Sequence, residues 1–165
     1  MSFPVHRPRR LRQSPAVRRL LRETTLEPAW ARRFEPPSLS GYESVGLTRY
    51  LMSLDDPSPE VIAAVEGAVA WFQANSIPDI RIETFTNDAG ERDRRVVAAP
   101  GAPLQWARFY DLTTGQPVFP GRDGILHKTY NEMAAGKNVG YDYYTTAPSS
   151  VLTTAQKKWR KAVGR

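Results

Sequence analysis

The spacing of apolar residues predicts two consecutive helices in the first half of the chain. From Tyr42 to Leu54, large apolar residues recur at intervals of three and four, and this pattern ends at Asp55-Asp56-Pro57. A second helix is predicted from Ser58 to about Asn75, because serine is a good N-cap and Pro59 suits a first helical turn. We expect both apolar stripes to be core. Their members are Tyr42, Val45, Leu47, Tyr50, Leu51 and Leu54 in the first helix, and Val61, Val65, Ala68, Val69 and Phe72 in the second.

The apolar period changes from helical spacing to alternation after Ile77-Pro78. Residues 80–83 alternate, residues 87–90 form a turn, and Val96-Val97 begin a return strand. Trp106 to Asp111 reads as a further strand, residues 121–124 as a tight turn, and Ser150 to Val163 as a terminal helix. The predicted fold class is therefore mainly α with a small antiparallel β part.

Positive charge is concentrated at the N-terminus. Residues 1–22 contain seven arginines and no acid, whereas the other 143 residues hold 16 lysines and arginines against 17 acids. We therefore expect residues 1–24 to form an Arg-rich extended arm, with a short helix from Ser14 to Arg22, outside a nearly neutral folded body of residues 25–165.

The composition of the chain excludes several classes of site and function. The sequence has no cysteine, which excludes disulfides, thiolate zinc sites and a cysteine nucleophile. No apolar run approaches the length of a membrane span, and the N-terminus lacks the apolar region of a secretory signal, so neither a membrane partner nor an export signal is predicted. The sequence leaves the localisation open.

Several spaced segments of the body are similar to one known family. They are Pro28-Ala29-Trp30-Ala31-Arg32-Arg33-Phe34-Glu35-Pro36-Pro37-Ser38-Leu39-Ser40-Gly41, Glu43-Ser44-Val45-Gly46-Leu47, Leu51-Met52-Ser53-Leu54, Trp106-Ala107-Arg108-Phe109-Tyr110-Asp111-Leu112, Arg122-Asp123-Gly124 and Gly140-Tyr141 with Tyr144-Thr145. In this order they resemble family 10 polysaccharide lyases, which are pectate lyases. The resemblance covers about residues 25–165.

The resemblance implies a fold, a reaction and partners. The family's catalytic domain is an α/α toroid about twice as long, so we expect a fragment of that toroid, a truncated lyase domain whose uncovered helix faces favour self-association. The family cleaves polygalacturonate by calcium-assisted β-elimination, and its members are typically secreted. Its calcium-binding carboxylates lie upstream of the matched part, so we identify no metal ligand in this chain. Whether the chain is itself an active enzyme stays open.

The resemblance also assigns site residues. Arg32 matches the family's arginine base, a role that requires alkaline pH or a depressed pKa because arginine is normally protonated. Arg122 matches the arginine of the Arg-Asp-Gly turn, where a guanidinium can hold a uronate carboxylate. Lys137, which stands where the family usually has arginine, and Tyr141 are assigned to substrate binding. Asp123 is interpreted as a turn former.

Three alternatives to an active lyase follow from the sequence. The first is a non-catalytic module that binds acidic polysaccharide. The second is a fusion or mis-assembled product, because residues 1–27 resemble the N-terminal arm of porphobilinogen synthase and the charge changes at the junction. The third is binding of nucleic acid by the basic arm, which we rank last because no aromatic residues are interleaved with its arginines.

Overall fold

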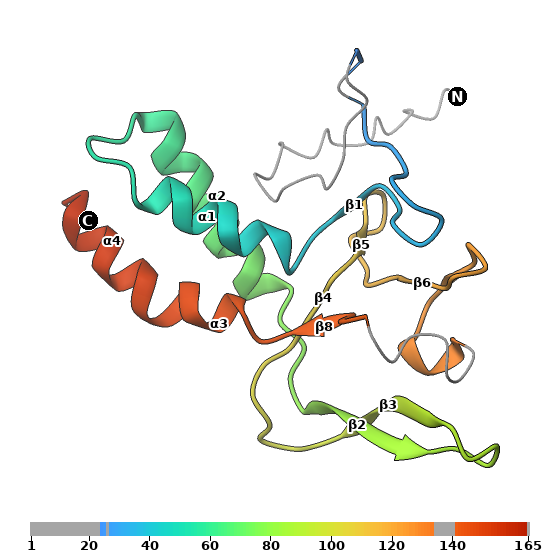
Figure 1. Ribbon diagram of the computed structural model, residues 1–165. Helices are drawn as coiled ribbons and strands as arrows, with labels where there is room; N and C mark the ends of the chain where they lie inside the picture. Colours follow the sequence, from blue (N-terminus) through green and yellow to red (C-terminus); the bar gives the residue numbers. More distant parts are fainter. Residues whose placement is uncertain (1–23, 26, 134–140, 165) are drawn as a thin grey trace, which may run out of the picture.

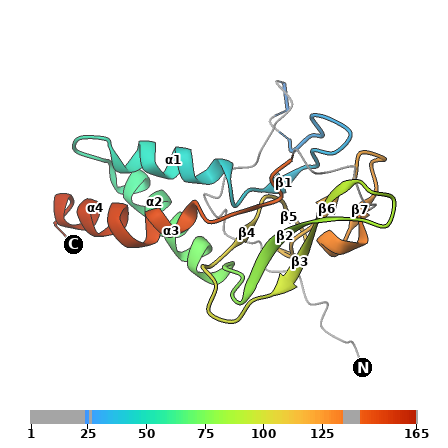
Figure 2. The same cartoon turned by 60° about the horizontal axis from the view of Figure 1, so that its bottom comes forward.

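The computed structural model describes residues 24, 25, 27–133 and 141–164. In this part of the chain the helices gather on one side, and short strand pairs, turns and loops form the other (Figure 1). A long hairpin projects along the lower edge of the second part (Figures 1 and 2). The predicted N-terminal arm and its short helix lie almost wholly outside the described residues.

The helical side consists of three packed helices. α1 spans Glu43–Met52 and α2 spans Pro59–Ala74. The third helix begins with α3 (Pro148–Ser150), continues through a π-helical turn (Val151–Ala155) and ends with α4 (Gln156–Ala162). Residues of α1, α2 and the π-helical turn contact one another pairwise. As predicted, Ser58 caps α2 by accepting a hydrogen bond from the Val61 amide at 3.4 Å.

The strands of the described residues form four separate antiparallel pairs. β2 (Ile80–Thr86) and β3 (Arg92–Ala98) make the long hairpin. The other pairs have two residues a side and join distant segments: β1 (Ser38–Leu39) with β5 (Tyr110–Asp111), β4 (Trp106–Ala107) with β8 (Tyr144–Thr145), and β6 (Phe119–Pro120) with β7 (Leu126–His127). A short 3₁₀ turn, Tyr130–Glu132, follows β7.

Two buried clusters meet at the segment from Trp106 to Tyr110. Trp106 is fully buried in the helical cluster, where its indole N–H donates to the carbonyl of Phe72 at 2.8 Å. Ala107, Phe109 and Tyr110 belong to a second cluster that is rich in aromatic rings. This segment therefore ties the helices to the loop-rich side, and the partly buried Trp71 packs against both clusters.

Gly41 places the start of α1 against this segment. A Cβ at Gly41 would collide with the carbonyl oxygen of Ala107 and would lie 2.9 Å from Cβ of Trp106. Only glycine permits so close an approach of two backbones.

The predicted fold class, a mainly α fragment of an α/α toroid, is wrong. The described residues combine three packed helices with four antiparallel strand pairs that form the other side of the structure. The strands were missed because most have only two residues, which is too short for a periodic pattern. The interpretation of Trp106 to Asp111 as one strand fails for the same reason, since β4 and β5 pair with different partners.

The predicted core face of α1 is also largely wrong. The buried residues of α1 are Ser44, Val45 and Thr48, whereas Leu47 and Tyr50 are 42% and 61% exposed. Small side chains allow α1 to approach its neighbours closely, and the Thr48 hydroxyl is satisfied by donating to the Ser44 carbonyl at 2.7 Å. The stripe predicted for α2 fares better, with Val65, Ala68, Val69 and Phe72 buried.

Among the described residues, no helix has both the length and the apolar character needed to cross a bilayer.

Candidate functional site

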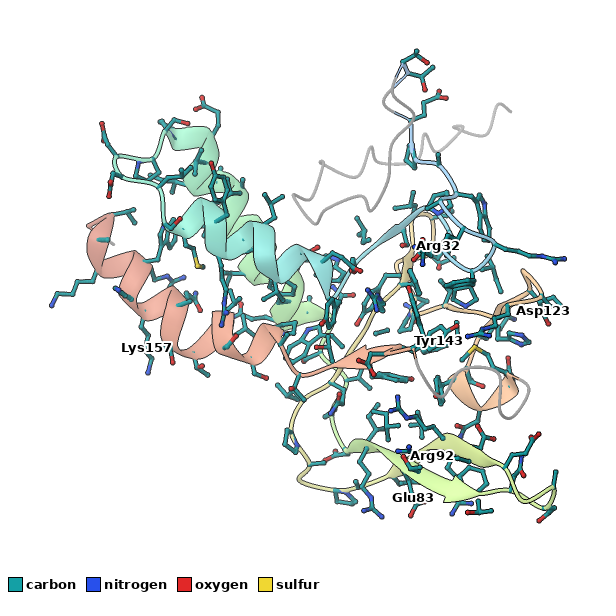
Figure 3. All side chains as sticks on the ribbon, viewed as in Figure 1. Arg32, Glu83, Arg92, Asp123, Tyr143 and Lys157 are labelled. Carbon is teal, nitrogen blue, oxygen red and sulfur yellow. The ribbon has the colours of Figure 1, made fainter. Side chains whose placement is uncertain are left out.

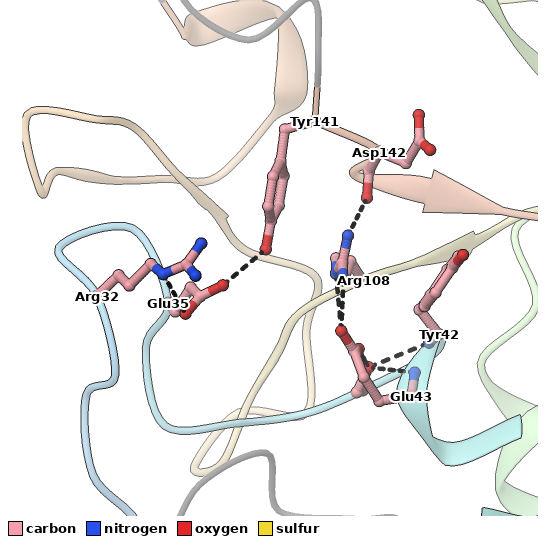
Figure 4. A network of polar contacts seen from close by, with 8 residues as sticks. Arg32, Glu35, Tyr42, Glu43, Arg108, Tyr141 and Asp142 are labelled. Carbon is pink, nitrogen blue, oxygen red and sulfur yellow. Dashed lines mark hydrogen bonds and ion pairs between the residues drawn. The ribbon is translucent and has the colours of Figure 1, made fainter. Parts of the chain in front are cut away.

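Arg32 lies in a tight loop whose only buried charge is Glu35. The loop closes when the Glu35 amide donates to the Arg32 carbonyl at 2.9 Å. The Arg32 side chain is 70% exposed, and its Nε lies 3.8 Å from Oε2 of Glu35, whose side chain is 8% exposed. A buried carboxylate thus holds one edge of an exposed guanidinium (Figure 4). Figure 3 shows where Arg32 lies in the whole structure.

Tyr141 connects this loop to the aromatic cluster. Its hydroxyl lies 3.4 Å from Oε1 of Glu35, at the long limit of a hydrogen bond, and its ring meets that of Phe34 edge to face at 5.5 Å. On the other side it stacks with Phe109 at 6.2 Å between ring centroids. Two of the predicted site residues, Arg32 and Tyr141, therefore share one carboxylate (Figure 4).

Arg122 occupies the turn between β6 and β7. The Gly121 amide donates to the Ile125 carbonyl at 2.9 Å, and the Asp123 carboxylate accepts from the Ile125 amide at 3.0 Å, so Asp123 shapes the turn as predicted. Arg122 is exposed in this turn. Its positive charge reaches Tyr143, where it lowers the pKa of the hydroxyl, although burial raises that pKa overall.

The turn of Arg122 packs against the loop of Arg32. Gly124 has a φ of +85°, which glycine adopts without strain, and a Cβ there would lie 3.3 Å from Cγ of Arg33. Because Arg33 is the neighbour of Arg32, the structure brings the segments of Arg32, Arg122 and Tyr141 to one side of the molecule.

Arg108 is a second structural centre that the sequence analysis did not single out. Its Nε and Nη2 lie 3.0 and 2.6 Å from Oε1 of Glu43, and the two side chains are 17% and 29% exposed. Glu43 also accepts from the Ser40 hydroxyl. The remaining Nη1 of Arg108 lies 3.4 Å from the carbonyl of Asp142. This network joins the start of α1 to the segment that carries Tyr141 (Figure 4).

The guanidinium of Arg108 is also enclosed by two rings. Its Cζ lies 4.7 Å from the ring centroid of Tyr42 and 4.6 Å from that of Tyr141. Burial opposes its charge, but the hydrogen bonds and attraction of Glu43 outweigh this effect and raise the pKa of Arg108. Arg108 is therefore a fixed cation that positions Tyr141, and it is unsuited to accept a proton.

The tyrosines behind this site are held in their neutral form. Burial raises the pKa of Tyr110, Tyr143 and Tyr144. The Tyr143 hydroxyl donates to the Pro120 carbonyl at 2.6 Å, and that of Tyr110 donates to the Asn75 carbonyl at 2.9 Å. Tyr110 and Tyr143 therefore serve as hydrogen-bond donors to the backbone.

Lys137, predicted to bind substrate, lies outside the described residues, so its placement is not described. Within residues 24–25, 27–133 and 141–164, no group of three or more acidic or histidine side chains is arranged to hold a metal ion.

The residues missed from sequence had a weak local signal or none. Glu35 stands three positions after Arg32 within a quoted motif, so its ion pair could have been anticipated. Arg108 and Glu43 also lie in quoted motifs, but 65 positions separate them and only the fold makes them partners.

Comparison with known proteins identifies the family. Residues 20–152 match the pectic acid lyase family. A mutant of a family 10 polysaccharide lyase from Cellvibrio cellulosa, in complex with trigalacturonic acid, superposes with a TM-score of 0.67 at 31% sequence identity, covering 81% of this chain and 41% of that chain. The family 10 polysaccharide lyase from the same organism gives the same score and identity, with 81% and 40% covered. No curated protein matches.

The chain thus spans about two fifths of the length of the solved lyases that it resembles. The resemblance of residues 1–27 to porphobilinogen synthase stays a prediction. The match over residues 20–152 confirms the family that the motifs of the body predicted, and the chain belongs to the pectic acid lyase family.

Proposed function

We propose that this chain carries the arginine side of a pectate lyase site and acts on polygalacturonate by β-elimination. The observation that supports this best is the packing of the Arg32 loop against the Arg122 turn, with Tyr141 beside both segments. Pectate is a polymer of uronates, so its recognition requires cations that face carboxylates. The lyase of known structure bound to trigalacturonic acid supports an acidic polysaccharide as the partner.

Each arginine has a distinct task in this proposal. A neutral Arg32 takes the C5 proton of a galacturonate unit, the electron pair forms the C4–C5 double bond, the C4–O4 bond breaks, and the leaving oxygen takes a proton from water. Arg122 neutralises the uronate carboxylate, which stabilises the charge that develops next to C5. Within the part of the chain that the structure describes, Arg122 makes no ion pair, so its guanidinium can receive a carboxylate.

Glu35 orients the guanidinium of Arg32 through Nε. Arginine is normally protonated, and only its neutral form can act as a base. We therefore expect activity only at alkaline pH. Calcium, when bound, would further neutralise the substrate carboxylate. From the family resemblance, we propose that its ligands lie in the part of the family domain that precedes the matched region.

The test is the formation of unsaturated product, followed by ultraviolet absorbance, from polygalacturonate with calcium at alkaline pH. We expect Arg32→Ala to abolish the activity and Arg81→Ala to leave it unchanged. Arg81 is a matched control because its side chain is 62% exposed and lies on the hairpin. An unchanged rate in Arg32→Ala would refute the assignment of the base.

A second candidate function is a non-catalytic module that binds acidic polysaccharide. It is favoured by the exposure of Arg122, whose guanidinium can hold a carboxylate without any catalytic base. It predicts retention on polygalacturonate that weakens with salt, together with no unsaturated product even at high protein concentration. Loss of retention in Arg122→Gln would support the same carboxylate contact as in the lyase proposal.

Self-association is a further proposal for the intact chain. Tyr42, Leu47 and Tyr50 lie exposed on or next to α1, and apolar side chains gathered on one helix favour a contact. Sedimentation of the wild-type chain and of Leu47→Lys tests it. A monomer at every concentration would end the proposal.

A further inference from the structure

A pocket separate from the Arg32 loop lies between the β2–β3 hairpin and the aromatic cluster. It has a volume of about 240 Å³. Pockets for drug-sized ligands have roughly 300–1,000 Å³, so this one suits a single sugar unit better than a longer ligand. Its lining includes Arg94, Asp142, Tyr130, Tyr141, Tyr143 and Tyr144.

Arg94 points into this pocket from the inner face of the hairpin. Residues of a strand alternate between faces, so Arg94 shares its face with Val96, and its partner across the hairpin, Thr84, also lines the pocket. The Arg94 side chain is 25% exposed, whereas that of Arg95, on the opposite face, is 52% exposed. A half-buried arginine on an inward strand position needs an anionic partner.

The ion pair of Arg94 with Asp142 is long and largely exposed on the side of Asp142. Its Nη1 lies 3.3 Å from Oδ1 of Asp142, a single long contact to a side chain that is 67% exposed. A guanidinium can hold a carboxylate through two parallel N–H bonds, so Arg94 retains donors that this contact does not use. A carboxylate that enters the pocket can compete with Asp142.

The pocket is held in shape before any ligand arrives. The side chain of Asn131 accepts from the Val96 amide at 2.8 Å and donates to the Val96 carbonyl at 2.9 Å. This double hydrogen bond fixes the hairpin against the 3₁₀ turn two residues from Arg94. Burial raises the pKa of Tyr130, and the charge of Arg94, which lines the same pocket, opposes this rise.

We propose that this pocket is an additional subsite for a uronate unit, with Arg94 as the residue that binds its carboxylate. The subsite adjoins the Arg32 loop because Tyr141 lines the pocket and also contacts Glu35. The tyrosine side chains provide an amphipathic wall of the kind that sugar rings pack against. The inference rests on the proposed function, and it adds Arg94 on the hairpin to Arg32 and Arg122 as a residue that contacts the substrate.

A purely structural role for Arg94 and a role in ligand binding predict opposite changes in ligand affinity for Asp142→Asn. If Arg94 and Asp142 only latch the hairpin to the β8 segment, then Arg94→Gln and Asp142→Asn both loosen the pocket and both weaken ligand binding. If Arg94 is a subsite, Asp142→Asn removes a competing carboxylate and strengthens binding. The main-chain carbonyl of Asp142, which faces Arg108, is unaffected by that substitution.

The experiment is calorimetric titration of the full chain with trigalacturonic acid. We expect Arg94→Gln to weaken binding by about tenfold, the loss of one charge-assisted contact, and Asp142→Asn to strengthen it by about two- to fivefold. Arg95→Gln is the matched control and should change the affinity by less than about twofold, because Arg95 pairs with Glu83 on the outer face. Arg94→Lys, which keeps the charge, should fall between wild type and Arg94→Gln.

The outcomes separate the two proposals. If wild type binds, Arg122→Gln abolishes binding and Arg94→Gln does not alter it, the subsite is refuted and the proposed function stands. Weaker binding by both Arg94→Gln and Asp142→Asn assigns the pair to structure and also refutes the subsite. If the wild-type chain does not bind the trisaccharide, both proposals are overturned.

Discussion

Disruption of the Arg108–Glu43 pair is expected to reduce stability more than loss of any surface pair in the chain. The perturbation is a double-mutant cycle of Glu43→Gln, Arg108→Gln and the combined variant. Glutamine keeps the length of Glu43 and removes its charge. The cycle isolates the energy of interaction from other effects of each substitution.

The expected magnitude follows from burial and geometry. Exposed ion pairs contribute about 0.2–1 kcal/mol, and loss of one partner of a fully buried pair costs about 3–5 kcal/mol. Arg108 and Glu43 are 17% and 29% exposed and are joined by two contacts of 3.0 and 2.6 Å, so the pair lies between these limits. We expect each single variant to lose about 2 kcal/mol of unfolding free energy and the coupling energy to be about 1.5 kcal/mol.

The assay is urea unfolding at neutral pH, followed by the fluorescence of the buried Trp106. The pair between Glu83 and Arg95, which are 32% and 52% exposed, is the control, with an expected coupling of about 0.5 kcal/mol. High salt should abolish the control coupling and leave most of the Arg108 coupling, because solvent ions screen buried charges poorly.

Two results would contradict this prediction. A coupling energy for Arg108 and Glu43 equal to that of the surface pair would show that the network does not hold the start of α1. Equal loss of both couplings in high salt would show that solvent reaches the guanidinium in spite of its low exposure.

Three further predictions concern stability. Burial raises the pKa of Tyr143 above its unfolded value of about 10, so the stability that its neutral hydroxyl contributes is complete below pH 10 and is lost as the pH rises from there. Tyr143→Phe should therefore reduce the slope of unfolding free energy against pH between pH 10 and 11 by up to about 1.4 kcal/mol per pH unit. The slope is measured by urea unfolding, with Tyr50→Phe as the control. Gly41→Ala should lower the unfolding free energy by about 2–4 kcal/mol in the same assay, and a wild-type midpoint would contradict the close approach to Ala107. Gly46→Ala, with open space around it, should raise the unfolding free energy by about 0.5–1 kcal/mol. Val45→Ala should cost about 1–3 kcal/mol and Leu47→Ala less than about 0.5 kcal/mol, and the reverse order would restore the core face predicted for α1 from sequence.

Local signals in the sequence were sufficient for the elements and turns that depend on neighbours along the chain. The cap of α2 at Ser58, the buried stripe of that helix and the turn shaped by Asp123 follow from spacings of two to four residues. The motifs of the body were also sufficient for the family. These features were predictable because their hydrogen bonds and packing repeat over one or two turns.

Contacts between distant segments were decided only by the tertiary structure. The face of α1 that is buried depends on which elements cover it, and they cover Ser44, Val45 and Thr48 and leave Leu47 exposed. The pairs Arg108–Glu43 and Arg94–Asp142 join residues 65 and 48 positions apart. No periodicity records such a pair, because the attraction between two charges acts only after the folded chain has brought them close together.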